Sequence, residues 1–262
     1  MDFLAAIHPG FVASGFLVGT LVGLTGVGGG SLLTPILILL FGIPPVAAVG
    51  TDLLHASASK TIGAFVHGAH DTIDWRVVRR LASGSVPTAT VTLLALNSLG
   101  ISSDDTNALV SVVLAVTLLI TSAALFFRKH LLTVYVNRVG TLDEGRTRWL
   151  TILTGVVLGA LVASTSVGAG ALGVTALILL YPKLPAARLV GSDIAHAVPL
   201  TLVAGAGHWL LGNTNFILAG TLLLGSIPGI LLGSALASRV PELLLRRVMA
   251  VVLLGVALRL LL

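Results

Sequence analysis

Apolar runs long enough to cross a lipid bilayer dominate this chain. A membrane-spanning helix needs about 20 consecutive, mostly apolar residues, and several segments reach that length. Asp, Glu, Lys and Arg make up only 10% of the 262 residues, against roughly 25% in a typical soluble domain. The sequence therefore predicts an all-α integral membrane protein. Its predicted spans are 46–68, 78–99, 107–127, 187–209, 215–237 and 243–262.

Two further apolar stretches, residues 11–41 and 149–181, are each interrupted by small residues. Each stretch contains two apolar runs of about 15 residues, which is short for a full span. The interruptions are Thr25–Gly30 and Thr165–Gly170. Irregular backbone inside a membrane is tolerated only where protein or a cavity surrounds it. We therefore expect each stretch to form a re-entrant hairpin of two half-helices that meet near the membrane midplane.

The distribution of Lys and Arg predicts how the chain lies in the membrane. If each hairpin returns to its starting side and each longer segment crosses, nearly all of the 15 basic residues fall on one side. Cytoplasmic loops carry an excess of basic residues, so we expect a multi-pass protein of the bacterial inner (plasma) membrane with both termini periplasmic. No Lys or Arg precedes the first apolar run, so a cleaved signal peptide is not expected.

The two halves of the chain resemble each other at a nearly constant spacing. An odd number of segments separates equivalent points, so we expect two inverted repeats of about five helical segments each. Inverted repeats with broken helices are the architecture of many secondary transporters. The matching positions are Gly50, Asp52, His55 and Gly84–Pro87 in the first half and Gly191, Asp193, His196 and Gly225–Pro228 in the second.

The repeat divides the chain into three predicted parts. Residues 1–127 form the first membrane repeat and residues 149–262 the second, inverted repeat. Residues 128–148 form a basic linker on the cytoplasmic side. Because the basic residues flank apolar spans, the net charge of +5 does not indicate a nucleic acid partner.

The two glycine-rich interruptions are predicted to bind an anion. Each precedes a half-helix, and the N–H groups and partial positive charge at a helix N-terminus favour a negative ligand. Inversion would bring the two N-termini face to face. The alternative is that these glycines only allow close helix packing. The candidate residues are Gly28, Gly29, Gly30, Gly168, Ala169 and Gly170.

Ionisable residues within the predicted spans are the candidate coupling groups. Asp52 and His55 lie on one helical face, and Asp193 with His196 repeats the arrangement. Such residues are costly in a membrane, so the aspartates are predicted to bind and release a proton with histidine as a relay. An alternative is that the aspartates cap helices that begin after a glycine break. Lys60 is either an anion contact or the partner of Asp52.

At these positions the chain resembles the sulfite exporter TauE/SafE family. The resemblance rests on Gly23–Gly30 followed by Pro35, then Pro44-Pro45 and Ala48–Thr51, with a weaker copy in the second half. It implies export of sulfite or organosulfonate anions across the inner membrane, coupled to an ion gradient. It also implies that the two glycine clusters, Thr51 and Ser192 contact the substrate. Many members carry Thr-Ser where this chain has Thr51-Asp52.

Two other classes of function remain as alternatives. The paired Asp-x-x-His motifs predict, if the halves bring them together, a ligand set for a transition metal and hence a divalent-metal or other cation transporter. No nucleophile–base–acid set is present and there is no cysteine, so neither an enzyme nor a cofactor is expected. The expected partners are a small anion and membrane lipid, with a homodimer left open.

Overall fold

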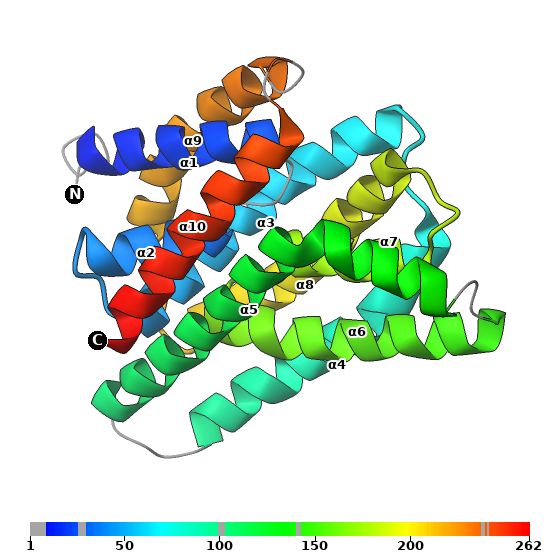
Figure 1. Ribbon diagram of the computed structural model, residues 1–262. Helices are drawn as coiled ribbons and strands as arrows, with labels where there is room; N and C mark the ends of the chain where they lie inside the picture. The colour runs from blue at the N-terminus through cyan, green and yellow to red at the C-terminus, as the bar shows by residue number, and fades with distance from the viewer. Residues whose placement is uncertain (1–8, 26–29, 99–102, 140–142, 237–238, 240) are drawn as a thin grey trace.

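A computed structural model describes residues 9–25, 30–98, 103–139, 143–236, 239 and 241–262, and in these ranges the chain is helical and contains no β-strand. This confirms the all-α prediction (Figure 1). The ten helices of the described part are α1 (Pro9–Thr25), α2 (Gly30–Leu39), α3 (Pro45–Ala69), α4 (Trp75–Ser98), α5 (Ser103–Val139), α6 (Glu144–Thr165), α7 (Ala171–Leu180), α8 (Ala186–Leu210), α9 (Phe216–Leu236) and α10 (Glu242–Leu261).

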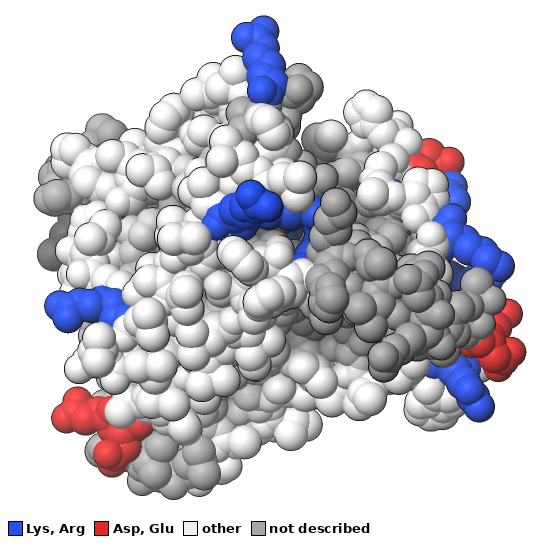
Figure 2. Space-filling model, in the orientation of Figure 1, with Lys and Arg blue, Asp and Glu red and all other residues white. Residues whose placement is uncertain are grey.

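The outer surface is suited to lipid. Large apolar side chains are exposed along many helices, with Phe65 at 76% and Leu210 at 81% exposure. Figure 2 shows a face that is mostly uncharged. Four helices of the described part are long and apolar enough to cross a membrane, in agreement with a multi-pass membrane protein. They are Ser103–Arg128 within α5, and α6, α8 and α9.

The two predicted hairpins differ in length from what the sequence indicated. Helices α2 and α7 have 10 residues each, about 15 Å of helix, too short to cross a bilayer. Helix α6, however, has 22 residues and is a full-length segment. It begins earlier than the apolar run because the Asp143 side chain accepts a hydrogen bond from the Gly145 N–H at its N-terminus. A cap of this kind extends the helix through polar residues.

The predicted linker 128–148 is also partly helical. Helix α5 continues to Val139, and α6 begins at Glu144. No glycine or proline occurs between residues 128 and 139, so nothing in the local sequence ends the helix at the membrane edge. Most residues of the predicted linker therefore lie on the helices α5 and α6.

Glycines bring two pairs of helices into backbone contact. Helix α1 packs along α9, and α4 packs along α6. A Cβ added at any of these glycines would collide with the backbone of the partner helix, so a larger residue would force the helices apart. The glycines are Gly15, Gly19 and Gly23 of α1, Gly225, Gly229 and Gly233 of α9, Gly84 of α4, and Gly155 and Gly159 of α6.

The two glycine-rich pairs correspond to each other under the sequence repeat. Helix α1 matches α6, and α9 matches α4, so each contact joins the first half of the chain to the second. Helices α3 and α8 also match, and they pack against each other at the centre (Figure 1). These contacts are those expected of a repeat. The inverted placement of the halves in a membrane stays a prediction.

Replacing Gly229 by alanine should destabilise the protein, because the new Cβ would meet the backbone of Phe16 and Thr20. Overpacking of this kind costs about 1–3 kcal/mol. The melting temperature of the detergent-purified protein measures the effect. Gly255→Ala is the matched control, because a Cβ at Gly255 has no atom within 4 Å. Equal melting temperatures for the two variants would contradict this account of the contact.

Candidate functional site

Two buried carboxylates lie within the central helices. Asp52 belongs to α3 and Asp193 to α8, and their exposed fractions are 0% and 1%. Helix α3 begins at Pro45 and α8 at Ala186, each preceded by a proline at the cap position, and neither helix is interrupted before its aspartate. Proline is favoured at such helix starts. The hypothesis that the aspartates cap helices after glycine breaks is therefore wrong.

Each carboxylate contacts the half-helix of its own half. The Thr34 hydroxyl of α2 donates to Asp52 Oδ2 at 2.6 Å. In the second half, the Asp193 carboxylate faces the backbone N–H of Gly170 and lies against Gly173 near the start of α7. The partial positive charge of a helix N-terminus attracts a negative group. The Asp193 carboxyl group therefore occupies the N-terminal end of α7.

The backbone before α7 takes its shape from glycine. Gly168 and Gly170 have φ values of 128° and 120°, a region that side chains disfavour. The Gly173 N–H donates to the Gly168 carbonyl at 3.1 Å, which closes the turn and starts the helix. This break is the predicted anion-binding cluster Gly168–Gly170, and it lies beside Asp193.

Two matched hydrogen bonds join the halves through histidine. His55 Nε2 of α3 and Ser226 Oγ of α9 are 2.7 Å apart, and His196 Nε2 of α8 and Ser85 Oγ of α4 are 2.8 Å apart. Both histidines are buried. His55 Nδ1 also lies 3.8 Å from Asp52 Oδ1. The predicted Asp–His pairs are thus each connected to a serine of the opposite half.

Lys60 places a cation near the two carboxylates. Its Nζ donates to the carbonyl oxygen of Ala169 at 3.3 Å, and the charges of both Asp193 and Asp52 act on it. The sequence left open whether Lys60 contacts an anion or partners Asp52. The structure gives it both aspartates as electrostatic partners and a place at the α6–α7 break, next to the predicted anion cluster.

Thr51 and Ser192 have backbone partners in the opposite half. The Thr51 hydroxyl accepts from the Asn215 N–H at 3.1 Å, and the Ser192 hydroxyl accepts from the Asp74 N–H at 2.8 Å. Both residues are fully buried. These matched bonds fasten the loop before α9 to α3 and the loop before α4 to α8. The two hydroxyls, expected at the substrate, are thus engaged in holding loops.

The first glycine cluster and the two Asp-x-x-His pairs are the remaining predicted site residues. Gly28 and Gly29 lie outside the described residues, and Gly30 is the first residue of α2. Within the described part of the chain, no group of three or more His, Asp or Glu side chains is arranged to hold a metal ion. The two Asp-x-x-His pairs accordingly do not assemble a ligand set there.

Sequence reasoning missed the partners of the charged residues. Thr34, Ser85 and Ser226 were not singled out, although Ser85 and Ser226 lie in the matching segments Gly84–Pro87 and Gly225–Pro228. That match was the available signal. His208 was not singled out either, and although it lies in the last turn of α8 it is 1% exposed.

Membrane-crossing helices around buried carboxylates, histidines and a lysine define the kind of ionisable interior found in membrane transport proteins. The profile of the sulfite exporter TauE/SafE family matches residues 11–260, and the chain belongs to this family. It is 39% identical over 212 residues to the "Probable membrane transporter protein YjnA" of Bacillus subtilis, covering 80% of this chain and 83% of the relative.

A more distant relative agrees. The chain is 27% identical over 218 residues to the "Probable membrane transporter protein MJ0441" of Methanocaldococcus jannaschii, covering 81% of this chain and 76% of that protein. No solved structure matches the chain. The family and the names of these relatives point to a membrane transporter rather than to an enzyme.

Replacing Ser192 by alanine should lower stability, because the Asp74 N–H loses its partner. An unsatisfied, partly buried donor costs about 1–2 kcal/mol. Thermal unfolding in detergent measures this loss. Ser83→Ala is the control, since the exposed Ser83 hydroxyl bonds only a carbonyl of its own helix. Weakened anion binding in Ser192→Ala at an unchanged melting temperature would instead favour a substrate contact.

Proposed function

We propose that this protein is a secondary transporter that exports a small anion of the sulfite or organosulfonate class across the inner membrane, coupled to protons through Asp52 and Asp193. The observation that carries this proposal is the position of Asp193, whose carboxylate faces the Gly170 N–H at the start of α7 beside Lys60. The family description, sulfite exporter, supports the substrate class and the direction.

Charge balance connects the proton to the anion. A substrate anion at the α7 N-terminus would lie close to the Asp193 carboxylate, and two like charges 4 Å apart repel by about 4 kcal/mol at an effective dielectric constant of about 20. Protonation of Asp193 removes this repulsion and frees Lys60 to pair with the anion. The anion and the proton therefore bind together.

The two histidines complete the proposed route of the proton. His55 lies beside Asp52, and both rings bond a serine of the opposite half. A histidine and a hydroxyl can pass a proton between them. Each route would thus run from a carboxylate of one half to a helix of the other half.

The membrane potential supports export of the complex. Sulfite carries two negative charges in its fully deprotonated form. A sulfite ion and one proton therefore leave with a net charge of −1. An elementary charge crossing the membrane changes energy by about 2.3 kcal/mol per 100 mV. A potential that is negative inside therefore still drives sulfite outward, whereas a monovalent sulfonate and one proton carry no net charge and leave down the concentration gradient of the sulfonate. This direction requires the arginine-rich loops to be cytoplasmic, as the distribution of basic residues predicts.

The aspartates can be tested by transport into proteoliposomes with a sulfonate, which stays anionic between pH 5 and 8. In the wild type we expect transport to fall as pH rises, by up to about tenfold per pH unit, because binding needs the protonated carboxyl group. Asp193→Asn mimics that form and should remove the pH dependence. Asp104→Asn, at the exposed start of α5, is the control. Wild-type pH dependence and uphill transport in both Asp52→Asn and Asp193→Asn would refute proton coupling.

Lys60→Met should weaken sulfonate binding by roughly tenfold or more, because a charge-assisted hydrogen bond is lost and the two carboxylates lose their shared cation. Dissociation constants from calorimetry measure the change. Thr201→Val, at the position that corresponds to Lys60 in the repeat, is the control because its hydroxyl bonds a carbonyl of its own helix. Unchanged affinity in Lys60→Met would rule out the lysine as an anion contact.

A further inference from the structure

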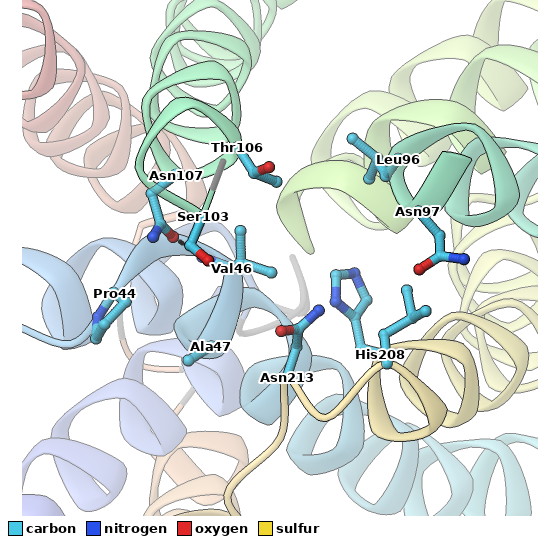
Figure 3. Close-up of a pocket in the computed structure, with 11 residues that line it drawn as sticks. Pro44, Val46, Ala47, Leu96, Asn97, Ser103, Thr106, Asn107, His208 and Asn213 are labelled. Carbon is cyan, nitrogen blue, oxygen red and sulfur yellow. Dashed lines mark hydrogen bonds between the residues drawn. The ribbon is translucent and has the colours of Figure 1, made fainter. Parts of the chain in front are cut away.

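A separate cavity of about 270 Å³ lies at the end of the molecule where α3 begins. We call it the neutral pocket, because none of the described residues that line it is Asp, Glu, Lys or Arg. In Figure 3 the His208 ring lies between the side chains of Asn213 and Asn97. The other polar residues that line the neutral pocket are Ser103, Thr106 and Asn107. A cavity of this size suits a ligand smaller than a drug molecule.

One apolar cluster adjoins both the neutral pocket and the site around Lys60. Val46 and Leu211 line the pocket, and both pack against a buried cluster that includes Val49, Leu93 and Ala163. Ala169, whose carbonyl oxygen accepts from Lys60, packs against the same cluster. The pocket and the site around Lys60 therefore both adjoin one buried apolar cluster.

His208 leaves one ring nitrogen without a partner at this pocket. Its Nε2 lies 2.8 Å from the carbonyl oxygen of Ala163, and a carbonyl only accepts, so Nε2 carries the hydrogen. Nδ1 has no hydrogen-bond partner among the described residues, although the side chain is 1% exposed. A buried polar atom of this kind is normally satisfied, so the free nitrogen is available to accept a hydrogen bond from a ligand in the pocket.

The other polar groups of the pocket supply donors. Asn107 Oδ1 accepts from the Val46 N–H at 3.1 Å, which fixes the orientation of that amide. Amide NH₂ groups and hydroxyls, such as those of Asn97, Asn213 and Ser103, donate to ligand oxygens. The neutral Nδ1 of His208, in contrast, accepts a hydrogen bond. The lining thus offers donors for several oxygens and one acceptor.

We propose that the neutral pocket is a second binding site for the transported anion, and that it selects small oxyanions that carry a hydrogen-bond donor of their own. The ligand oxygens accept from the amides and hydroxyls, and an O–H of the ligand donates to His208 Nδ1. Hydrogen sulfite and hydroxyalkyl sulfonates have this chemistry, and simple alkyl sulfonates lack the donor. The inference rests on the proposed function, since it takes the ligand to be the transported anion.

The repeat provides an internal comparison. His67 corresponds to His208, but its Nδ1 lies 2.8 Å from the Thr72 hydroxyl. That hydroxyl donates its own hydrogen to the His67 carbonyl oxygen, so Nδ1 of His67 is satisfied within the protein. Of this matched pair, His208 alone has a buried ring nitrogen without a hydrogen-bond partner among the described residues, and His67 is a natural control.

The chain contains no cysteine, so an introduced cysteine is the single thiol of the protein and can report on the pocket. Ala47→Cys places a single thiol in the pocket wall, and the rate of its modification by a small thiol reagent reports whether the pocket is occupied. The probes are ethanesulfonate and 2-hydroxyethanesulfonate, which differ by one hydroxyl. We expect the hydroxylated sulfonate to protect the thiol at roughly threefold to tenfold lower concentration, the effect of one neutral hydrogen bond.

Two variants assign that preference to the ring nitrogen. His208→Gln, added to Ala47→Cys, keeps an amide donor for the Ala163 carbonyl and should abolish the preference. His67→Gln should keep it. An equal preference with and without His208, or no preference in the parent, overturns the proposal. Absence of protection in a protein that still transports both sulfonates also overturns it while leaving the proposed function intact. Absence of both protection and transport refutes the two together.

Discussion

The burial of two carboxylates beside one lysine is the constraint on which the rest of this structure depends. An ionised group away from water must be paired or hydrogen-bonded, or it neutralises. Asp52 is held by Thr34, and Asp193 by the backbone at the start of α7. Lys60 faces both. The short helices α2 and α7 each present a polar group to one of these buried carboxylates. Both helices therefore contribute to the polar site as well as to packing.

Close helix contact positions the two serines that hydrogen-bond His55 and His196. Ser226 lies on α9 between Gly225 and Gly229, and Gly19 of α1 would collide with its backbone if it carried a side chain. In the other helix pair, a side chain at Gly159 of α6 would likewise collide with the backbone of Ser85 on α4. The glycines set the depth at which each serine lies, and the serines in turn meet His55 and His196. Packing and polar chemistry are therefore specified by the same short segments.

Much of this arrangement could be predicted from sequence, because membrane interiors tolerate few alternatives. Apolar run length gave the helical class, and the recurrence of Asp and His marked the central helices. The serine partners could not be inferred, since a hydroxyl next to glycine also suits plain helix packing. The loop contacts of Thr51 and Ser192 could not be inferred either, because a family motif does not reveal which backbone groups a hydroxyl also meets. The start of α6 could not be predicted from hydropathy, because it is set by the polar cap residue Asp143.

Lys60 breaks the correspondence between the halves. Its counterpart is Thr201, whose hydroxyl bonds the Ala197 carbonyl of its own helix. In a transporter of matched halves, the inward-open and outward-open states arise when the halves exchange conformations. Two identical halves would give these states equal energies. With the halves inverted as the sequence predicts, a cation contributed by one half alone gives the two states unequal energies, and one of them is then favoured even without a gradient across the membrane.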